Sequence, residues 1–141
     1  MTRRIPTPHW NSGGCRWCGE AVESPTKRKR TWHPECVSAY LVATSSGAQH
    51  TALWKRDRGI CAGCRRDCNA VPTVVFEADH IVPLHTVDRS LPWAELRHFW
   101  SLDNLQTLCR PCHLAKCRRE AGACAEKRRA RTQPSLDMVP A

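Results

Sequence analysis

The sequence predicts a small α+β domain that is stabilised by zinc and preceded by a zinc finger and a helical connector. Three features support this class: cysteine pairs with Cys-x2-Cys spacing, two short strand-like segments, and a long helical pattern after the last cysteine pair. A chain of 141 residues buries only about two-thirds of its unfolded surface, so bound metal would supplement a small core. The expected organisation is a flexible leader (1–14), an accessory zinc finger (15–36), a helical connector (37–58), the main domain (59–131) and a disordered tail (132–141).

The ten cysteines are interpreted according to the compartment of the protein. In a secreted protein they would suggest disulfides, whereas in a reducing cytosol they suggest metal. The N-terminus is basic but lacks the apolar core of a secretory signal, and no stretch approaches the roughly twenty apolar residues of a membrane span. We therefore expect an intracellular protein with no membrane partner and with metal-binding cysteines.

The charge balance favours a polyanionic partner. The chain carries 22 Lys and Arg against 13 Asp and Glu, for a formal charge of +9, and it stays basic when thiolates hold zinc. Nucleic acid is the default partner for such a field, although many basic proteins do not bind it. The basic run at residues 27–30 is interpreted as a solvated loop, with phosphate contact as the alternative.

The predicted finger has the pattern Cys-x2-Cys-x14-His-x2-Cys, formed by Cys15, Cys18, His33 and Cys36. Two close pairs of such ligands are typical of tetrahedral structural zinc. The alternative is a set of buried free cysteines beside an incidental histidine, so whether His33 is the fourth ligand stays open.

Residues 34–58 show apolar residues at helical spacing, interrupted at residues 45–47. This pattern predicts two helices, and Gly59 is well placed to end the second.

The second predicted zinc site pairs two knuckles that are separated by 44 residues: Cys61, Cys64, Cys109 and Cys112. Two Cys-x2-Cys units close a four-thiolate site with little strain. Cys68 is a possible substitute ligand, but we interpret it as a small thiol that is either buried or at the surface.

The main domain is expected to contain two strands and a helix. The β-branched and aromatic cluster at residues 73–76 predicts a strand with Asp79 and His80 at its end, and residues 105–108 predict a second strand. Ser90 is expected to cap a short helix in the connection between them. The last helix should run from about residue 110 to 130, with a core-facing stripe at Leu114, Cys117, Ala121 and Cys124.

Asp79, His80 and His113 carry the residue types that phosphodiester hydrolysis needs. A carboxylate and a second donor can hold a divalent cation, and a neutral histidine is a suitable base at physiological pH. Adjacent strand residues point to opposite faces, so we expect the backbone to turn or bulge at Asp79 and His80 if both act in one site. Because His113 directly follows the proposed zinc ligand Cys112, structural zinc would fix its helix to the hairpin.

These motifs resemble one known family. Residues 79–84 read Asp-His-Ile-Val-Pro-Leu, and residues 103–116 read Asp-Asn-Leu-Gln-Thr-Leu-Cys-Arg-x-Cys-His-x-x-Lys. The pattern resembles the HNH endonuclease family with its ββα-metal fold, over roughly residues 50–120. The N-terminal Cys-Arg-Trp-Cys-Gly and Trp-His-Pro-Glu-Cys resemble the accessory finger of one HNH branch, which occurs as stand-alone microbial and phage proteins and as a domain on DNA-remodelling enzymes.

The resemblance implies a role for each matching residue. His80 would be the general base, Asp79 and His113 would hold the catalytic metal, and Asn104 would hydrogen-bond the backbone that positions His80. Lys116 could contact phosphate. The implied products carry a 5′-phosphate and a 3′-hydroxyl, and the implied cofactors are two structural Zn2+ and one catalytic divalent metal (Mg2+ or Mn2+, with Ni2+ or Zn2+ as alternatives). The expected nucleic-acid contacts, mainly to the backbone, are Lys116, Arg110, Arg118 and Arg119.

One departure is the 23-residue separation of His80 from Asn104, which exceeds that of compact family members. Trp93 and Trp100 lie in this insertion, which we expect to provide packing; shaping substrate access or mediating association are the alternatives.

The leading functional hypothesis is a metal-dependent DNA endonuclease or nickase. The alternatives are a non-catalytic zinc module that binds nucleic acid and an assembly module of a larger DNA-processing complex.

Overall fold

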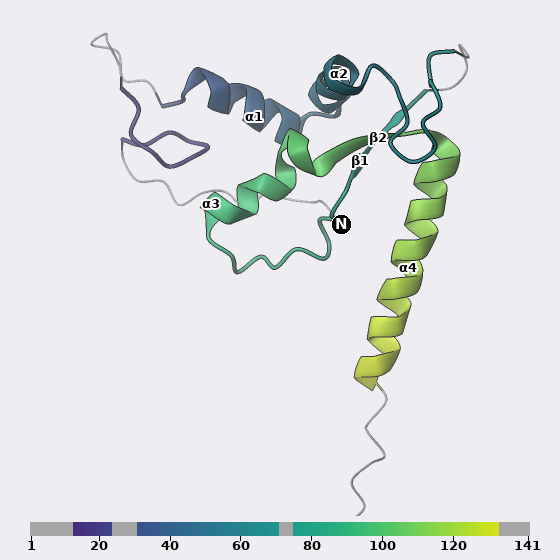
Figure 1. The fold of residues 1–141 in the computed structure, drawn as a ribbon. Helices are drawn as coiled ribbons and strands as arrows, with labels where there is room; N and C mark the ends of the chain where they lie inside the picture. The colour runs from purple at the N-terminus through teal and green to yellow at the C-terminus, as the bar shows by residue number, and fades with distance from the viewer. Residues whose placement is uncertain (1–12, 24–30, 71–74, 133–141) are drawn as a thin grey trace, which may run out of the picture.

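The computed structural model describes residues 13–23, 31–70 and 75–132. The expected leader at 1–12, the basic run at 27–30 and the tail at 133–141 lie outside these ranges, as does part of the first predicted strand. The elements, in chain order, are α1 (Pro34–Thr44), α2 (Ser46–Asp57), β1 (Glu77–His80), α3 (Trp93–Leu96), η1 (Arg97–Trp100), η2 (Leu102–Asn104), β2 (Leu105–Leu108) and α4 (Arg110–Thr132). The α+β class is confirmed, as are the two helices between residues 34 and 58 (Figure 1).

The break between α1 and α2 occurs at Ser45, whose backbone is extended (φ −121°, ψ 120°) and whose hydroxyl accepts from the Ala48 N–H. The far end of α2 closes with Arg58 and Gly59 at positive φ, 53° and 77°. Glycine adopts this conformation without steric cost, which accounts for the predicted stop at this position. The short helix α3 differs from the prediction: Pro92 rather than Ser90 precedes it, and Ser90 bonds to Asp88 instead.

β1 and β2 form an antiparallel hairpin in which Glu77 pairs with Leu108 and His80 with Leu105. The ladder runs without interruption through Asp79 and His80, and the chain bends only from Ile81 onward. The predicted bulge at Asp79 and His80 is therefore wrong. The side chains of the two residues therefore point to opposite faces of the hairpin, as in any regular strand. This arrangement is compatible with the different roles expected for them.

Helices α2 and α4 contact different faces of this hairpin. Leu53 of α2 is fully buried in the cluster that also packs Ala78 of β1. Glu77 and Asp79, on the other face of β1, contact His113 of α4. The face that carries Ala78 therefore packs against α2, and the other face presents Glu77 and Asp79 to α4.

A second core joins the N-terminal finger to the insertion between the strands. Its buried members are Cys15, Trp17, Cys36, Ala43, Leu84, Val87, Leu96 and Trp100. The Trp93 indole N–H donates to the Trp17 carbonyl, and the two rings meet edge to face with centroids 5.0 Å apart. The insertion packs, as expected, and its packing partner is the finger.

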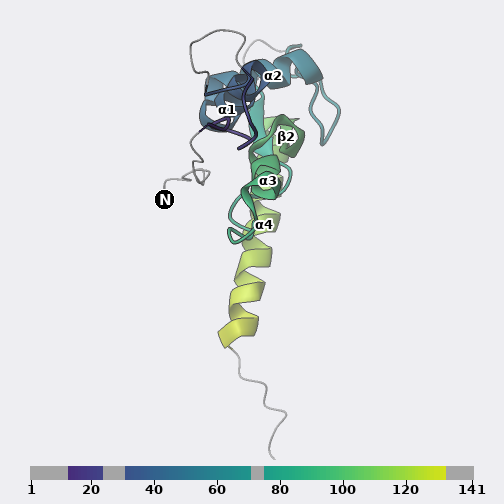
Figure 2. The same ribbon diagram turned by 90° about the vertical axis from the view of Figure 1, so that its left-hand side faces the viewer.

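Helix α4 extends away from the rest of the molecule in two perpendicular views (Figures 1 and 2). None of its residues, all of which the structure describes, is buried. The predicted core stripe is therefore wrong: Leu114 is 43% exposed, and Cys117 and Cys124 are exposed as well. Helical periodicity identifies a shared face, but it cannot say whether another element covers that face.

Among the residues that the structure describes, no helix has the length and apolar character needed to cross a membrane.

Candidate active site

Four thiols meet where the hairpin joins α4. Their sulfur atoms lie within 4.8 Å of one another and belong to the predicted set Cys61, Cys64, Cys109 and Cys112. Cys68 is buried but stands outside this group. Four thiolates in two Cys-x2-Cys knuckles are the set that structural zinc prefers, so the cluster could bind zinc. Glycine suits position 63 in the first knuckle, because a Cβ there would lie 3.1 Å from the Cys112 sulfur and would press on this ligand atom.

The thiols of this cluster differ in acidity. Burial raises the pKa of Cys61, but hydrogen bonds from the backbone N–H groups of Cys109, Cys64 and Gly63 outweigh it and lower the pKa to about 6. Sharing hydrogen bonds with the Cys109 and Cys64 thiols raises the pKa of Cys112 to about 12. In the absence of metal one sulfur is thus ready to act as a thiolate while another retains its proton, which a bound cation would displace.

The finger residues Cys15, Cys18, His33 and Cys36 also converge, with ligand atoms within 4.8 Å of one another. His33 Nδ1 lies 3.4 Å from the Cys18 sulfur, and Nε2 lies 3.0 Å from the Ala21 carbonyl oxygen. A carbonyl can only accept, so Nε2 carries the hydrogen and Nδ1 turns its lone pair toward the thiols. The Ala21 carbonyl also raises the pKa of His33. The histidine is oriented as a fourth ligand.

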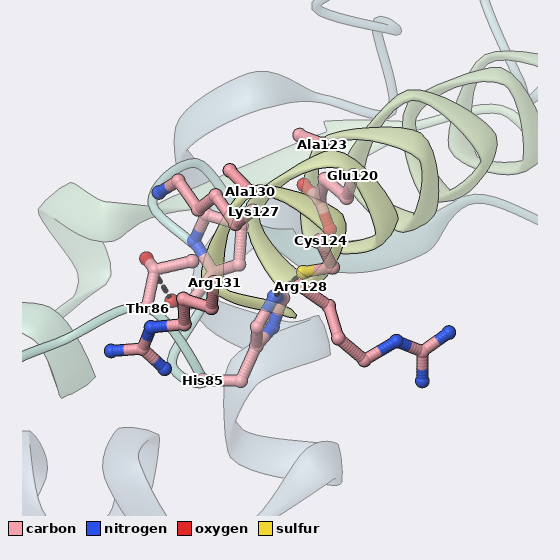
Figure 3. A pocket seen from close by; sticks show the side chains of 10 residues that line it. His85, Thr86, Glu120, Ala123, Cys124, Lys127, Arg128, Ala130 and Arg131 are labelled. Atoms are coloured by element: carbon pink, nitrogen blue, oxygen red, sulfur yellow. Dashed lines mark hydrogen bonds between the residues drawn. The ribbon is translucent and has the colours of Figure 1, made fainter. Parts of the chain in front are cut away.

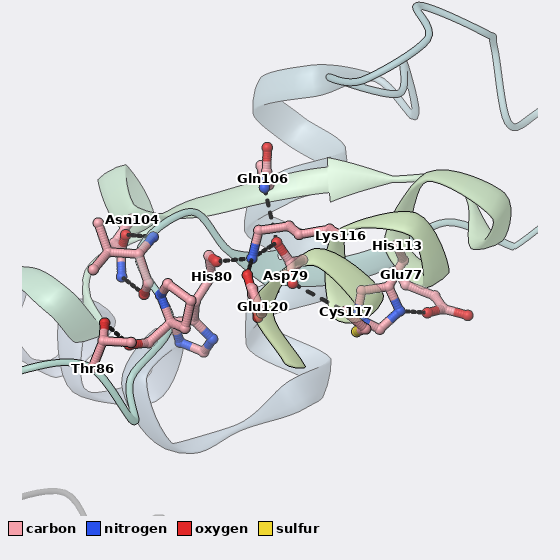
Figure 4. Close-up of polar contacts among 12 residues, drawn as sticks. Glu77, Asp79, His80, Thr86, Asn104, Gln106, His113, Lys116, Cys117 and Glu120 are labelled. Carbon is pink, nitrogen blue, oxygen red and sulfur yellow. Dashed lines mark hydrogen bonds and ion pairs between the residues drawn. The ribbon is translucent and has the colours of Figure 1, made fainter. Parts of the chain in front are cut away.

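A polar cluster lies between β1 and the first turns of α4 (Figure 4). His113 Nδ1 contacts the Glu77 carboxylate, while His113 Nε2 lies 3.6 Å from Oδ1 of the nearly buried Asp79. A carboxylate behind an imidazole fixes the ring orientation and leaves the other nitrogen available to a cation. Asp79 and His113 therefore fit a divalent metal as a nitrogen and oxygen pair that leaves positions for water and phosphate.

Lys116 is held by three protein acceptors. Its Nζ lies 2.9 Å from Asp79 Oδ2, contacts Glu120 and donates to the His80 carbonyl at 2.7 Å. Burial lowers the pKa of Lys116, but its pairing with Glu120 and Asp79 outweighs burial and raises the pKa. An ammonium group has three N–H donors, so the expected phosphate contact would require Lys116 to exchange one of these partners.

Asn104 connects the segment that follows His80 to the insertion. Its Oδ1 accepts from the Val82 N–H at 2.8 Å, and its Nδ2 donates to the Val82 and Phe99 carbonyls at 3.1 and 2.8 Å. The Asn104 carbonyl accepts from the Ile81 N–H at 2.8 Å. This buried amide fixes the backbone just after β1. The His80 imidazole points toward the following loop, apart from the Asp79 carboxylate (Figure 4).

Four residues of the site were not predicted. Gln106 donates to Asp79 Oδ2 at 2.8 Å, and the Cys117 sulfur lies 3.6 Å from His113 Nε2. Glu77 and Glu120 are the carboxylate partners described above. Strand alternation from Asp79 identifies Glu77, and the i, i+4 spacing on a helix identifies Cys117 and Glu120. Only the hairpin register brings Gln106 opposite Asp79.

The remaining predicted nucleic-acid contacts lie at the surface of α4. Arg110 is 73% exposed in its side chain and pairs with Glu77 at 3.0 Å. Arg118 and Arg119 are exposed.

These features define a small ββα domain in which thiols hold the helix to the hairpin beside a carboxylate and imidazole pair. Residues 61–119 match the sequence model of the HNH endonuclease family. This match agrees with the family that the motifs predicted, and it suggests a nuclease or nucleic-acid-binding function for this part of the chain. No curated protein and no solved structure matches the chain.

Proposed function

We propose that the protein is a metal-dependent DNA endonuclease or nickase. The observation that carries this proposal is the meeting of Asp79 and His113 across the hairpin and α4, with Glu77 behind the imidazole. A module that only binds nucleic acid has no need of such a pair beside a second histidine, His80. The family match supports the same reading.

Each residue of the cluster has a chemical role in this proposal. Asp79 and His113 would hold a divalent cation, with Mg2+ or Mn2+ expected first, which would act as a Lewis acid toward the scissile phosphate and the leaving oxygen. His80 accepts the proton of the attacking water at its imidazole. Its separation from the Asp79 carboxylate suits this role, because water and phosphate must lie between base and cation (Figure 4). The family resemblance favours products with a 5′-phosphate and a 3′-hydroxyl, for which the bond between phosphorus and the 3′ oxygen breaks and the oxygen of the attacking water stays on the 5′-phosphate.

Asn104 and Lys116 are positioning residues in this scheme. Asn104 holds the backbone of Val82, and Lys116 holds both the His80 carbonyl and the Asp79 carboxylate. Together they set the strand end that carries the base against the helix that carries His113. The thiol cluster would hold the same two elements together when zinc is bound.

Incubation of supercoiled plasmid with Mg2+, Mn2+ or Ni2+ tests the proposal. We expect the protein to nick or linearise the plasmid, and His80→Ala to lower the rate by about 100-fold or more because the base is lost. His98→Ala is the matched control, since His98 is an exposed histidine outside the cluster. Equal rates for His80→Ala and the parent would exclude His80 as the base. Binding of DNA without cleavage under any metal would instead favour a non-catalytic module.

A further inference from the structure

A groove of about 760 Å3 lies between the distal half of α4 and the loop that follows β1. Its walls include Pro83, His85 and Thr86 from the loop, and Lys127, Arg128 and Arg131 from the helix. The His85 Nε2 atom lies 3.2 Å from the Cys124 sulfur, so this contact joins the loop to the helix. Lys127 and Arg131 lie to one side of this contact, and Arg128 lies to the other (Figure 3).

The charge of this groove is unbalanced. Its one acidic wall residue, Glu120, is paired with Lys116. No salt bridge joins Lys127, Arg128 or Arg131 to a carboxylate within the part of the chain that the structure describes. Lys127 and Arg131 also stand four residues apart on the helix, a spacing at which like charges repel. This cost is relieved when an anion occupies the groove.

The helix dipole explains part of this charge but not its placement. Cations near a helix C-terminus are favourable on any face. Arg129, next to Arg128 in the chain, serves the dipole equally well and does not line the groove. Lys127, Arg128 and Arg131 instead share the face of α4 that carries His113, Glu120 and Cys124, since these residues recur at helical spacing.

The groove also adjoins the candidate active site. Pro83 and Thr86 belong to the segment that Asn104 holds after His80, and Glu120 contacts the same Lys116 that pairs with Asp79. A chain of phosphates that leaves the candidate site along α4 would therefore enter the groove.

We infer that this groove binds the sugar–phosphate backbone of duplex DNA at a distance from the scissile phosphate. The inference rests on the proposed function, because that function identifies DNA as the ligand. Arg128 and Arg131 follow His113 by 15 and 18 residues, which is about 22 and 27 Å along a helix. At about 3.4 Å per base pair, the groove contacts the backbone roughly six to eight base pairs from the cleaved bond.

The test measures binding separately from cleavage. A labelled 24-base-pair duplex is titrated by fluorescence anisotropy at several salt concentrations, in a His80→Ala background and without chelator so that zinc is retained. The double substitution Arg128→Gln and Arg131→Gln is compared with Lys55→Gln and Arg129→Gln, which removes the same charge from exposed positions outside the groove. Glutamine keeps the helical propensity of α4.

We expect the groove variant to bind about tenfold to thirtyfold more weakly near 0.15 M salt, and its slope of log K against log salt to flatten by about 1.8, or ~0.9 for each lost phosphate contact. The control should keep the slope of the parent. An unchanged slope in the groove variant, or an equal loss in the control, would overturn the inference even if the protein cleaves DNA.

A second measurement is made with His80 intact, in the parent and in the groove variant. Its substrate is bis(p-nitrophenyl) phosphate, a small diester that reaches only the candidate active site. We expect the groove variant to hydrolyse this diester at the parental rate while its KM for plasmid rises. A parallel loss on both substrates would place Arg128 and Arg131 in the reaction itself and contradict a remote backbone site. Because the binding measurement needs no cleavage, failure of the proposed function and failure of this inference give different results.

Discussion

Asp57 shows how one side chain couples the connector helix to the hairpin. Its carboxylate pairs with Arg56 and accepts from the Thr107 hydroxyl at 2.8 Å. Thr107 is fully buried in β2, and Arg56 also donates to the Leu102 and Leu105 carbonyls at 2.8 Å each. These bonds satisfy polar groups at the end of α2 that would otherwise be costly to bury. Hydrogen bonding by Arg56, opposed by burial and reinforced by Thr107, lowers the pKa of Asp57.

The sign of this shift leads to a pH-dependent prediction. A carboxyl whose pKa is lower in the folded state stabilises the fold above its unfolded pKa of about 3.9, and this contribution is lost as the pH falls through the folded-state value. We expect Asp57→Asn to lower the free energy of unfolding by about 1–2 kcal/mol at pH 7 and to have a smaller effect in strong acid. Urea titrations at pH 7 and near pH 3 measure this difference. A destabilisation that is equal at both pH values would show that the charge of Asp57 contributes nothing.

At the scale of elements, the four-thiol cluster fixes the start of α4 to the hairpin and to the first knuckle. The Ala62 N–H donates to the Thr107 carbonyl at 2.8 Å, and the Cys109 N–H donates to the Cys61 sulfur at 3.3 Å. The hairpin has only two strands, and a two-stranded sheet is marginally stable by itself in water. Bound zinc would supply the missing stability, because binding to the folded cluster adds directly to folding.

Replacing one ligand of this cluster tests the role of the metal. We expect the parent to contain about two zinc ions per chain and Cys109→Ser to contain about one, with a large fall in melting temperature. Cys68→Ala is the matched control, since Cys68 is equally buried but stands outside the cluster. Elemental analysis and thermal unfolding check both variants. Loss of zinc from Cys68→Ala with retention in Cys109→Ser would reassign the ligand set.

At the scale of the whole molecule, the insertion between the strands links the finger to the domain built from the hairpin and α4. Leu96 and Trp100 of the insertion are buried with Trp17 and Cys36 of the finger region. In a small chain, two small cores are more stable when they bury surface against each other. The insertion therefore connects the finger to the hairpin through buried contacts.

Removing the central aromatic contact of this junction should loosen the finger. We expect Trp93→Ala to lower the free energy of unfolding by about 2 kcal/mol. This loss is smaller than the one expected for a fully buried tryptophan, because Trp93 is partly exposed. Limited proteolysis should then cut near residues 15–36 first. Trp54→Ala, at an exposed tryptophan of α2, is the control and should leave the finger protected. Unchanged proteolysis in Trp93→Ala would show that the finger holds its place by other contacts.

Several features of the fold and the candidate site could be predicted from local pattern. Cysteine spacing predicted both ligand clusters, and helical periodicity predicted the break between α1 and α2 and the extent of α4. The HNH motif identified the segment that the family model also matches. Spacing succeeds here because a knuckle or a helical turn is built from neighbours in the chain, and backbone geometry limits how they can meet.

Other features depended on contacts between distant segments. Lys116 looks like an exposed phosphate ligand in the sequence, yet Asp79 and Glu120 hold it inside the site. The stripe that contains Cys117 and Cys124 looks like a core face, yet both cysteines are exposed and Cys124 lines a cationic groove. By itself, the sequence determined which cysteines and which histidine cluster, where the long helices lie and which family model the chain matches. The tertiary structure alone decided which surfaces are covered and which charges are paired, because burial and ion pairing depend on what the rest of the chain brings to each surface.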